Sequence, residues 1–331
     1  MLAAVLTRFG APLELTELDV PRPGPGEVLV RVLASAVNPL DTKIRRGQAA
    51  HAKTEPPAVL GIDMAGMVVA LGEGVDGFRL GDEVFGMTGG VGGIQGSLAE
   101  FAAVDGRLLA LKPRSLSMVQ AAALPLAFVT AWEALVDRAD VRGGQRVLVH
   151  GGAGGVGYVA IQLARSRGAE VFATGSPASL EVIVQAGAVA IDYTSVSATE
   201  YVNTHTAGAG FDVVFDNVGG ATLDDSFGSV KRYTGHVVSA LGWGTHRLAP
   251  LSFRGATYSG VFTLLPLLTG QHREHHGMAV REAATLAEAG LLTPRLDPRT
   301  FHLETVEEAY QAVEERTNAG KVVVTIGSGR G

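Results

Sequence analysis

Residues 146–158, Arg146-Val-Leu-Val-His-Gly-Gly-Ala-Gly-Gly-Val-Gly-Tyr158, decide the fold of this chain of 331 residues. An apolar strand over 146–150 runs into Gly152-Ala-Gly-Gly-Val-Gly157, and the apolar periodicity of a helix over 156–166 follows at once. The glycines therefore form the pattern G-x-G-x-x-G in the strand–turn–helix context that a dinucleotide-binding loop requires.

Each glycine of this loop has a physical task in binding a dinucleotide. Gly152 permits the tight turn, Gly154 lets the backbone approach a pyrophosphate, and Gly157 lets the helix pack closely on the strand. The helix N-terminus offers unpaired N–H groups to the phosphates. We expect cofactor contacts from the whole loop rather than a purely structural glycine turn: Gly151, Gly152, Ala153, Gly154, Gly155, Val156 and Gly157.

The chain that follows the loop alternates between strands and helices. Strands are predicted over 170–174, 189–192, 211–216 and 236–241, and a further helix over 179–186. Alternation at this spacing predicts βαβ units, and hence a doubly wound parallel sheet with helices on both faces. The expected fold class is therefore α/β.

The first third of the chain is instead β-rich. Short alternating or β-branched runs predict strands over 3–7, 27–34, 65–71, 81–86 and 99–104. After Phe262 we expect a helix over 274–289, a helix opened by the capping box Thr305-x-x-Glu308, and a last strand over 321–326. We therefore expect a β-rich domain made of residues 1–124 and 262–331, interrupted by a Rossmann domain made of residues 125–261.

Composition restricts the class of partner. The chain has 27 Lys and Arg against 33 Asp and Glu, and this net charge of −6 argues against nucleic acid or an anionic membrane surface. It has no cysteine, which excludes disulfides, a thiol nucleophile and Cys-ligated zinc. Since no stretch has the length of a membrane span or the layout of a targeting peptide, we expect a cytoplasmic protein.

The end of the second strand of the predicted Rossmann domain bears on the choice of cofactor. An NAD site usually has an Asp or Glu about 20 residues after the loop, where it binds the ribose 2′-hydroxyl. This chain has Phe172-Ala-Thr-Gly-Ser-Pro177 instead, and Gly175 and Ser176 leave room for a 2′-phosphate. The sequence therefore favours NADP(H) over NAD(H), although no Lys or Arg follows until well past Tyr193.

Three further motifs accompany the glycine loop: Gly144-Gln-x-x-Leu148, Gln162-x-x-Arg165 and Gly320-Lys-Val-Val-Val324. With them the chain resembles the medium-chain dehydrogenase/reductase superfamily over essentially its whole length. Within it, the chain is similar to the zinc-free quinone oxidoreductase, or zeta-crystallin-like, branch. The resemblance implies a cofactor-binding Rossmann domain inserted in a GroES-like catalytic domain.

The resemblance also bears on a metal. Zinc alcohol dehydrogenases of this superfamily carry a Cys at the position of Asn38 and a Gly-His-Glu motif at the position of Gly61-Ile62-Asp63. Here Asn38 and Ile62 replace the two ligands, whereas a zinc site needs three or four ligands that converge. We therefore expect no metal.

Further contacts are implied position by position. Thr130 resembles the threonine beside the nicotinamide, and Tyr193 the tyrosine near the adenosine phosphate. The other implied cofactor contacts are Asn217, Leu241, Gly242, Phe262, Asn318 and Lys321. Lys43 stands where quinone reductases often have a tyrosine, which leaves the shape and polarity of the substrate pocket open.

Several polar residues allow two interpretations. Asn38 could orient the substrate or the nicotinamide ribose, or cap a turn. Asp41 could relay protons, although we expect it to form a salt bridge within its own domain; Lys43 could donate to an oxyanion or stay solvated. We expect His150 to be a packed residue at a strand end, and His272-Arg-Glu-His-His276 to be an exposed polar turn rather than a metal site.

The expected activity follows from these points. A site without a metal cannot polarise an ordinary ketone strongly, so it suits acceptors that are already electrophilic. We expect hydride transfer from NADPH to a small quinone or enone, in a homodimer or homotetramer. The first alternative is an enoyl or alkenal double-bond reductase. The second is an NADPH-binding structural or RNA-binding crystallin-like protein, although the absence of a Lys/Arg cluster argues against RNA.

Overall fold

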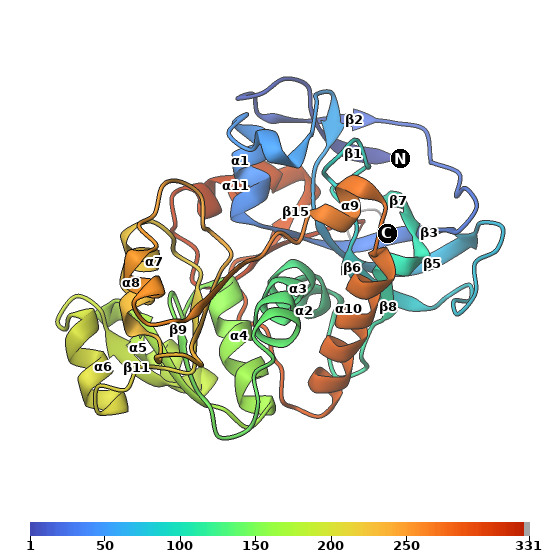
Figure 1. Cartoon of the computed structure of the whole chain (residues 1–331). Coiled ribbons are helices and arrows are strands. Elements are labelled where there is room, and N and C mark those ends of the chain that lie inside the picture. The colour runs from blue at the N-terminus through green and yellow to red at the C-terminus, as the bar shows by residue number, and fades with distance from the viewer. Residues whose placement is uncertain (328–331) are drawn as a thin grey trace. The chain divides into compact units, whose positions relative to one another are not determined.

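The computed structural model describes residues 1–327 and divides the chain into two compact units (Figure 1). Unit 1 consists of Met1–Leu126 together with the chain from Leu264 onward, and unit 2 consists of Ala127–Thr263. These limits differ by two residues from the boundaries expected from the sequence. The strands of unit 1 form two sheets, and those of unit 2 form one.

Unit 2 is built on a parallel sheet. Its strands are β9 (Arg146–Val149), β10 (Glu170–Gly175), β11 (Val189–Asp192), β12 (Val213–Asp216), β13 (His236–Ser239) and β14 (Thr257–Gly260). Their order across the sheet is β11-β10-β9-β12-β13-β14, and every neighbouring pair is parallel. The chain moves outward from β9 in one direction and then from β12 in the other, which is the order of a Rossmann fold. The predicted doubly wound α/β fold is confirmed.

Helices connect these strands. They are α4 (Gly155–Ser166), α5 (Leu180–Ala186), α6 (Ala198–Thr206), α7 (Ala221–Ser229) and the short α8 (Ala249–Ser252). Phe172 and Phe211 lie in the core of unit 2 with ring centroids 5.4 Å apart, and Tyr201 of α6 packs against Phe211 at 6.3 Å. Burying such aromatic side chains removes a large apolar area from water, which stabilises the fold by about 1.5–3 kcal/mol for each.

Unit 1 is β-rich. Its strands are β1 (Leu2–Leu6), β2 (Leu13–Glu17), β3 (Glu27–Val37), β4 (Ala58–Val59), β5 (Asp63–Leu71), β6 (Glu83–Met87), β7 (Phe101–Asp105), β8 (Leu109–Leu111), β15 (Phe301–His302) and β16 (Val322–Thr325). One sheet has the order β2-β1-β4, and the other β15-β16-β3-β5-β6-β8 with β7 also paired to β3. The last strand, β16, is antiparallel to β3 with Val322 opposite Val37. The C-terminal segment therefore completes the sheet that the first third of the chain begins.

The helices of unit 1 lie around these sheets. They are α1 (Pro39–Arg45), α2 (Met118–Ala122), α9 (Leu265–Thr269), α10 (Arg273–Glu288) and α11 (Val306–Glu314), while α3 (Pro125–Trp132) crosses the boundary between the units. Helix α10 packs along β8, as Figure 1 shows. The predicted capping box at the start of α11 is wrong. The hydroxyl of Thr305 accepts the backbone N–H of His302 at 3.0 Å instead of capping the helix, because a 3₁₀ turn (Leu303–Thr305) precedes it.

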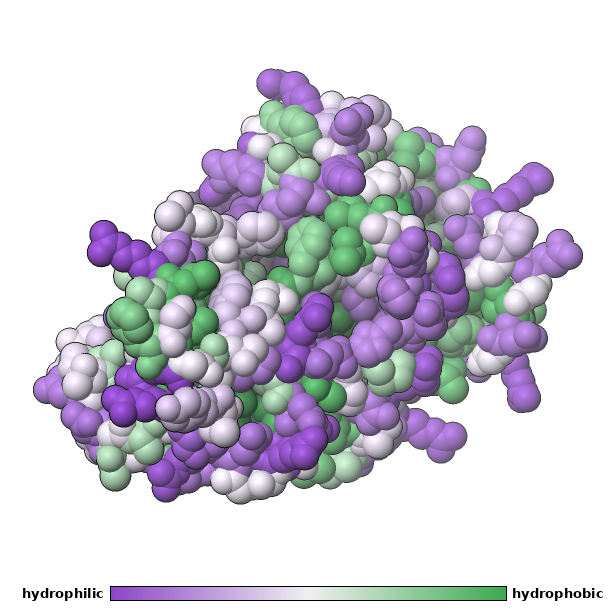
Figure 2. All heavy atoms as spheres, in the orientation of Figure 1, coloured by the Kyte–Doolittle hydropathy of each residue, from purple (hydrophilic) through white to green (hydrophobic). Residues whose placement is uncertain are grey.

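The surface is mixed in character. On the face seen in Figure 2, hydrophobic residues form separate groups among hydrophilic ones, and one such group lies over the region of α8, where Leu248 and Phe253 are exposed. Among the described residues, no helix combines the length and the apolar character that a membrane crossing needs.

Candidate active site

The glycine loop of unit 2 has the conformation that its sequence predicts. Gly151 has a φ of +70°, a left-handed conformation that favours glycine. A Cβ on Gly157 would overlap the carbonyl oxygen of Gly151, so only glycine lets α4 start this close to the end of β9. A Cβ on Gly152 would lie 2.6 Å from Cβ of Ala173 on the neighbouring strand. Gly151, Gly152 and Gly157 are thus required by the fold itself.

Gly154 differs from these three glycines. It is the N-cap of α4 in an extended conformation that any residue can adopt, with φ −73° and ψ 167°. A Cβ added at this position would have the carbonyl oxygen of Gly151 as its nearest neighbour, 3.3 Å away. The fold therefore constrains Gly154 less than the other three glycines, and the lack of a side chain there fits a ligand that approaches the backbone.

The end of β10 brings together the residues expected near the adenosine. The backbone N–H of Tyr193 donates to the carbonyl oxygen of Gly175 at 3.3 Å, and the Tyr193 side chain is 59% exposed. A Cβ on Gly175 would lie 2.5 Å from Oγ of Ser179, so this glycine makes room for the following turn. Ser176 follows it at the same edge of the sheet and carries no charge. Its carbonyl oxygen accepts the N–H of Ser179 at 2.8 Å.

A buried carboxylate that the sequence reasoning missed organises the ends of β12 and β13. Oδ1 of Asp216 accepts the backbone N–H groups of Val218 and Gly219, each at 3.0 Å, and Oδ2 accepts the hydroxyl of Ser239 at 2.7 Å. The hydroxyl of Ser239 in turn accepts the N–H of Leu241 at 3.1 Å. Asp216 therefore fixes the two loops that carry Asn217 and Leu241. In the sequence, this role could have been recognised from an Asp that ends an apolar strand.

His150 and Asn217 lie beside each other at the carboxyl end of the sheet. Nδ2 of Asn217 donates to the carbonyl oxygen of His150 at 3.3 Å, and Nδ1 of His150 lies 3.0 Å from Oγ1 of Thr174. Burial lowers the pKa of His150 to about 4, so the ring is neutral at pH 7. Within residues 1–327, the buried Oδ1 of Asn217 has no hydrogen-bond partner. An unsatisfied acceptor here, next to the glycine loop, fits a polar group of a dinucleotide.

Three further residues were expected to contact the cofactor: Gly242, Phe262 and Thr130. Gly242 lies so close to the hydroxyl of Tyr258 that a side chain would collide with it. The ring of Phe262 packs edge-on against Trp243, with centroids 6.1 Å apart. Thr130 is buried on α3.

Unit 1 contains a buried polar cluster made by three distant segments. Asn38 follows β3, Asp63 begins β5, and Lys321 precedes β16. Nδ2 of Asn38 donates to Oδ2 of Asp63 at 3.0 Å, and Nζ of Lys321 donates to Oδ1 of Asn38. The same ammonium lies 3.5 Å from Oδ2 of Asp63. The sequence assigned Asn38 and Lys321 to separate tasks and gave Asp63 none. The structure joins all three in one cluster.

Two carboxyl groups of this region have raised pKa values. Burial raises the pKa of Asp63. The charge of Lys321 and the hydrogen bonds from Asn38 and Leu126 oppose this rise. Burial raises the pKa of Asp41 to about 7, with a smaller contribution from the charge of Asp63. The expected salt bridge of Asp41 is wrong for the described residues: Oδ2 accepts the N–H of Asn38 at 2.8 Å, and Oδ1 has no partner among them.

Two predicted residues lie outside this cluster. Lys43 is exposed on α1, so the structure does not bring it to Asn38 or Asp63. The amide of Asn318 donates to the carbonyl oxygen of Gly320 at 2.7 Å and so shapes the turn that precedes Lys321.

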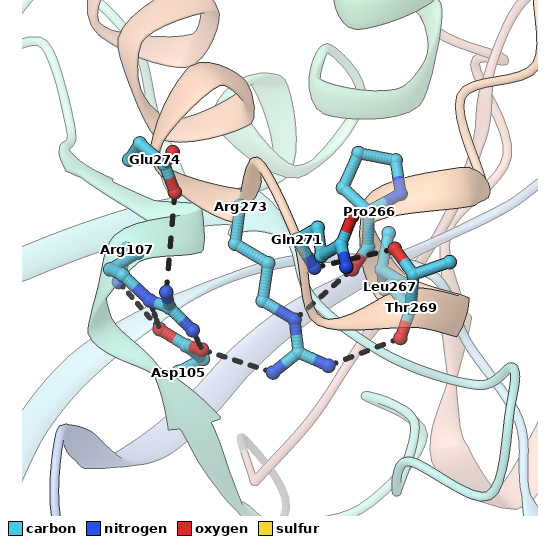
Figure 3. Close-up of polar contacts among 8 residues, drawn as sticks. All are labelled: Asp105, Arg107, Pro266, Leu267, Thr269, Gln271, Arg273 and Glu274. Carbon is cyan, nitrogen blue, oxygen red and sulfur yellow. Dashed lines mark hydrogen bonds and ion pairs between the residues drawn. The ribbon is translucent and has the colours of Figure 1, made fainter.

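The histidine-rich segment at the start of α10 has a structural task. The predicted exposed turn is wrong for His276, which is buried and whose pKa burial lowers to about 4. Figure 3 shows the neighbouring Arg273, which donates to Oδ2 of Asp105 at 3.0 Å and to the carbonyl oxygens of Pro266 and Leu267 at 3.2 and 3.1 Å. Arg273 thereby ties α9 and α10 to the end of β7. Among the described residues, no three His, Asp or Glu side chains are grouped to hold a metal.

Comparisons with known proteins agree with this architecture. Residues 24–114 match the family described as alcohol dehydrogenase GroES-like domain, and residues 186–324 match the family described as zinc-binding dehydrogenase. An NADPH-dependent alkenal/one oxidoreductase, chloroplastic, of Arabidopsis thaliana is 36% identical over 317 residues, which are 93% of this chain and 74% of that protein.

Solved structures give the same result. An alcohol dehydrogenase superfamily protein from Novosphingobium aromaticivorans has a TM-score of 0.97 at 56% identity, covering 99% of this chain and 100% of the other. The quinone oxidoreductase from Coxiella burnetii has a TM-score of 0.83 at 28% identity, covering 99% of each chain.

Proposed function

The chain belongs to the medium-chain dehydrogenase/reductase superfamily, in its quinone oxidoreductase-like branch, and on that basis we propose that it reduces conjugated carbonyl compounds with NADPH. The observation that carries the proposal is the glycine loop. It lies on β9, where the strand order of the parallel sheet reverses, and this is the place where open α/β sheets bind their ligands.

The residues around the loop fit a dinucleotide. A Cβ on Gly154 would meet only one protein atom, the carbonyl oxygen of Gly151 at 3.3 Å, and Asn217 places an unsatisfied acceptor at the same end of the sheet. When bound, a reduced nicotinamide supplies a hydride. NADP(H) is the proposed form, because neither Gly175 nor Ser176 carries a carboxylate that would repel a 2′-phosphate.

The residues at the metal positions of the superfamily do not fit zinc, and we propose that the enzyme uses none. Ile62 is fully buried and offers no lone pair. The oxygen of Asn38 already accepts a hydrogen bond from the Lys321 ammonium, whose positive charge would repel a second cation. The family description of a zinc-binding dehydrogenase is therefore not carried over to this chain.

The proposed acceptors are electrophilic without a metal. Similarity to the alkenal/one oxidoreductase supports an alkene conjugated to a carbonyl group as the acceptor, and similarity to the quinone oxidoreductase supports a quinone. Both acceptors take a hydride on carbon and develop negative charge on oxygen. The Asn38 amide has two N–H groups, of which one binds Asp63, so the second can donate to that oxygen.

The test is a steady-state assay of NADPH oxidation with a panel of quinones and a panel of alkenals and enones. We expect turnover with at least one panel, and the ratio of kcat/KM values assigns the acceptor class. Tight NADPH binding without turnover on either panel would contradict the proposal and favour a binding or structural protein. Failure to bind NADPH would contradict the cofactor assignment as well.

A further inference from the structure

Lys321 is a buried cation held from two sides. Its side chain is only 10% exposed. Oδ1 of Asn38 accepts a hydrogen bond from its ammonium, and the carboxylate of Asp63 forms an ion pair with it. Asp63 is itself fixed, because its Oδ1 accepts the backbone N–H of Leu126 at 2.7 Å. A lysine ammonium has three N–H donors, and two acceptors account for two of them.

Lys321 differs from Arg45, another largely buried cation of unit 1, in the elements that it joins. Elsewhere in unit 1, Arg45 pairs with Glu307 at 2.8 Å and Glu314 at 2.5 Å at the contact of α1 with α11, which joins two helices. The Lys321 cluster instead joins the ends of β3, β5 and β16, which the register of Val322 with Val37 already aligns. A buried ammonium is not needed to align them, since apolar side chains would do so without the desolvation of two charges.

The reaction of the proposed acceptors creates a need for such a cation. Addition of a hydride to the β-carbon of an enone forms a C–H bond. The π pair of the C=C bond becomes the C=C bond of an enolate, and the π pair of the C=O bond moves onto the oxygen. The resulting enolate then takes a proton from water at the α-carbon, which gives the saturated carbonyl product. A fixed positive charge near the oxygen lowers the free energy of the charged transition state.

We propose that the Lys321 ammonium, oriented by Asn38 and Asp63, stabilises the negative charge on the oxygen of the acceptor. This inference rests on the proposed reductase function and assigns to Lys321 the electrostatic task that a metal ion performs in metal-dependent dehydrogenases. Asp63 is then a positioning residue for the ammonium, and Asn38 both orients the ammonium and donates its second amide N–H to the oxygen.

The absence of cysteine allows a direct test of the charge. The variant Lys321→Cys carries a single thiol, which is alkylated in the unfolded chain before refolding. 2-Bromoethylamine restores a side chain with an ammonium of nearly the original length, whereas iodoacetamide adds a neutral amide. Wild-type chain taken through the same cycle is the control, and intact mass verifies the alkylation.

We expect kcat of the neutral product to fall about 10²-fold. The Kd for NADPH should change by less than about tenfold, because Lys321 is only one of the expected cofactor contacts. The kcat of the ammonium product should recover to within about tenfold of wild type. Equal activity of the two products would overturn the inference. Lys321→Met and Lys321→Arg are measured without refolding; the first removes the charge and the second keeps it. A wild-type kcat in Lys321→Met would also overturn the inference. Lys53→Met, which removes an exposed lysine that has no part in the Asn38–Asp63–Lys321 cluster, is the matched control for net charge.

Failure of the proposed function has a different signature. In that case the wild-type protein itself turns over no quinone or enone. If the wild-type protein is active and Lys321→Met is equally active, only the role of Lys321 is rejected, and the proposed function stands.

Discussion

The carbonyl oxygen of Gly151 occupies the space that a side chain on Gly157 would need, and it lies 3.3 Å from the corresponding position of Gly154. The same oxygen also accepts the N–H of Gly154 at 3.0 Å. Gly157 is therefore constrained by the protein itself, whereas under the proposed function Gly154 is constrained mainly by the dinucleotide.

This difference predicts separate outcomes for two variants. Gly154→Val should remain folded, with the Kd for NADPH raised about 10²-fold or more, because the branched side chain fills the space that a pyrophosphate needs. Gly157→Ala should lose stability, because its methyl group would overlap the carbonyl oxygen of Gly151. Thermal unfolding and titration of NADPH fluorescence measure the two effects.

Gly228→Val is the control, because nothing lies within 4 Å of its Cβ position on α7 in the same unit. It should leave the Kd for NADPH unchanged. A folded Gly154→Val protein with wild-type affinity would place the cofactor elsewhere.

The end of β10 predicts the preference between cofactors. We expect kcat/KM for NADPH to exceed that for NADH about tenfold, or ~1.4 kcal/mol, because nothing at Ser176 repels a 2′-phosphate. Ser176→Asp should invert the preference, since its carboxylate would repel the phosphate and accept from a ribose hydroxyl. The measurement is kcat/KM for both cofactors in both proteins.

Asn203→Asp adds the same charge on the exposed surface of α6 and should change nothing. Wild-type preference for NADH, or an unchanged preference in Ser176→Asp, would refute this account of the strand end.

Removal of metal should leave the reaction intact. Dialysis against a chelator is expected to keep kcat within about twofold, because Ile62 and the Asn38–Lys321 pair supply no zinc site. Metal content is measured on the same samples before and after dialysis. Stoichiometric zinc, whose loss abolishes the rate and whose return restores it, is the contrary result.

Asp41 predicts a pH dependence of stability. Its pKa is raised from 3.8 to about 7, so the folded state binds the proton more tightly than the unfolded state does. The stabilisation is therefore complete below about pH 4 and is lost as the pH rises to about 7. Between pH 5 and pH 7 the wild-type protein should lose about 2–3 kcal/mol of unfolding free energy relative to Asp41→Asn, as measured by urea unfolding.

The groups that face Asp41 also titrate or carry charge, and they include Asp63, Lys321 and Tyr310. They are unchanged in Asp41→Asn, so the difference between the two proteins isolates Asp41. Parallel pH profiles of the two proteins would show that this carboxyl group is ionised throughout the range.

The sequence predicted five of the six strands of the parallel sheet closely, because each of these five is a largely apolar run beside a turn residue; β14, with the sequence Thr-Tyr-Ser-Gly, is not such a run. It missed α6 and α7, whose threonine, asparagine, aspartate and serine residues have low helix propensity. For α6 a signal was present: the N–H of Ser197 donates to Glu200 at 2.7 Å in a capping box, the Ser-x-x-Glu pattern. Tertiary packing, as of Tyr201 on Phe211, determines these helices more than local preference does.

The candidate site was predictable in part for a related reason. The glycine loop is contiguous, so its pattern identifies it without knowledge of the fold. The pairing of Asn38 with Lys321 joins positions 283 residues apart and depends on the register of β16 against β3. No local pattern encodes that register, and for the same reason nothing in the sequence indicated that Asp63 binds both residues.

The position of β16 between β3 and β15 has a consequence for synthesis of the protein. The strands of unit 2 form one uninterrupted stretch of chain, which can fold on the ribosome while the last helices are still being translated. The sheet of unit 1 lacks β16 until residues 322–325 have left the ribosome. Until then residues 34–37 of β3 lack their partner on the edge where β7 pairs residues 27–31. During that interval the nascent chain offers the unpaired end of β3 to chaperones or to wrong partners.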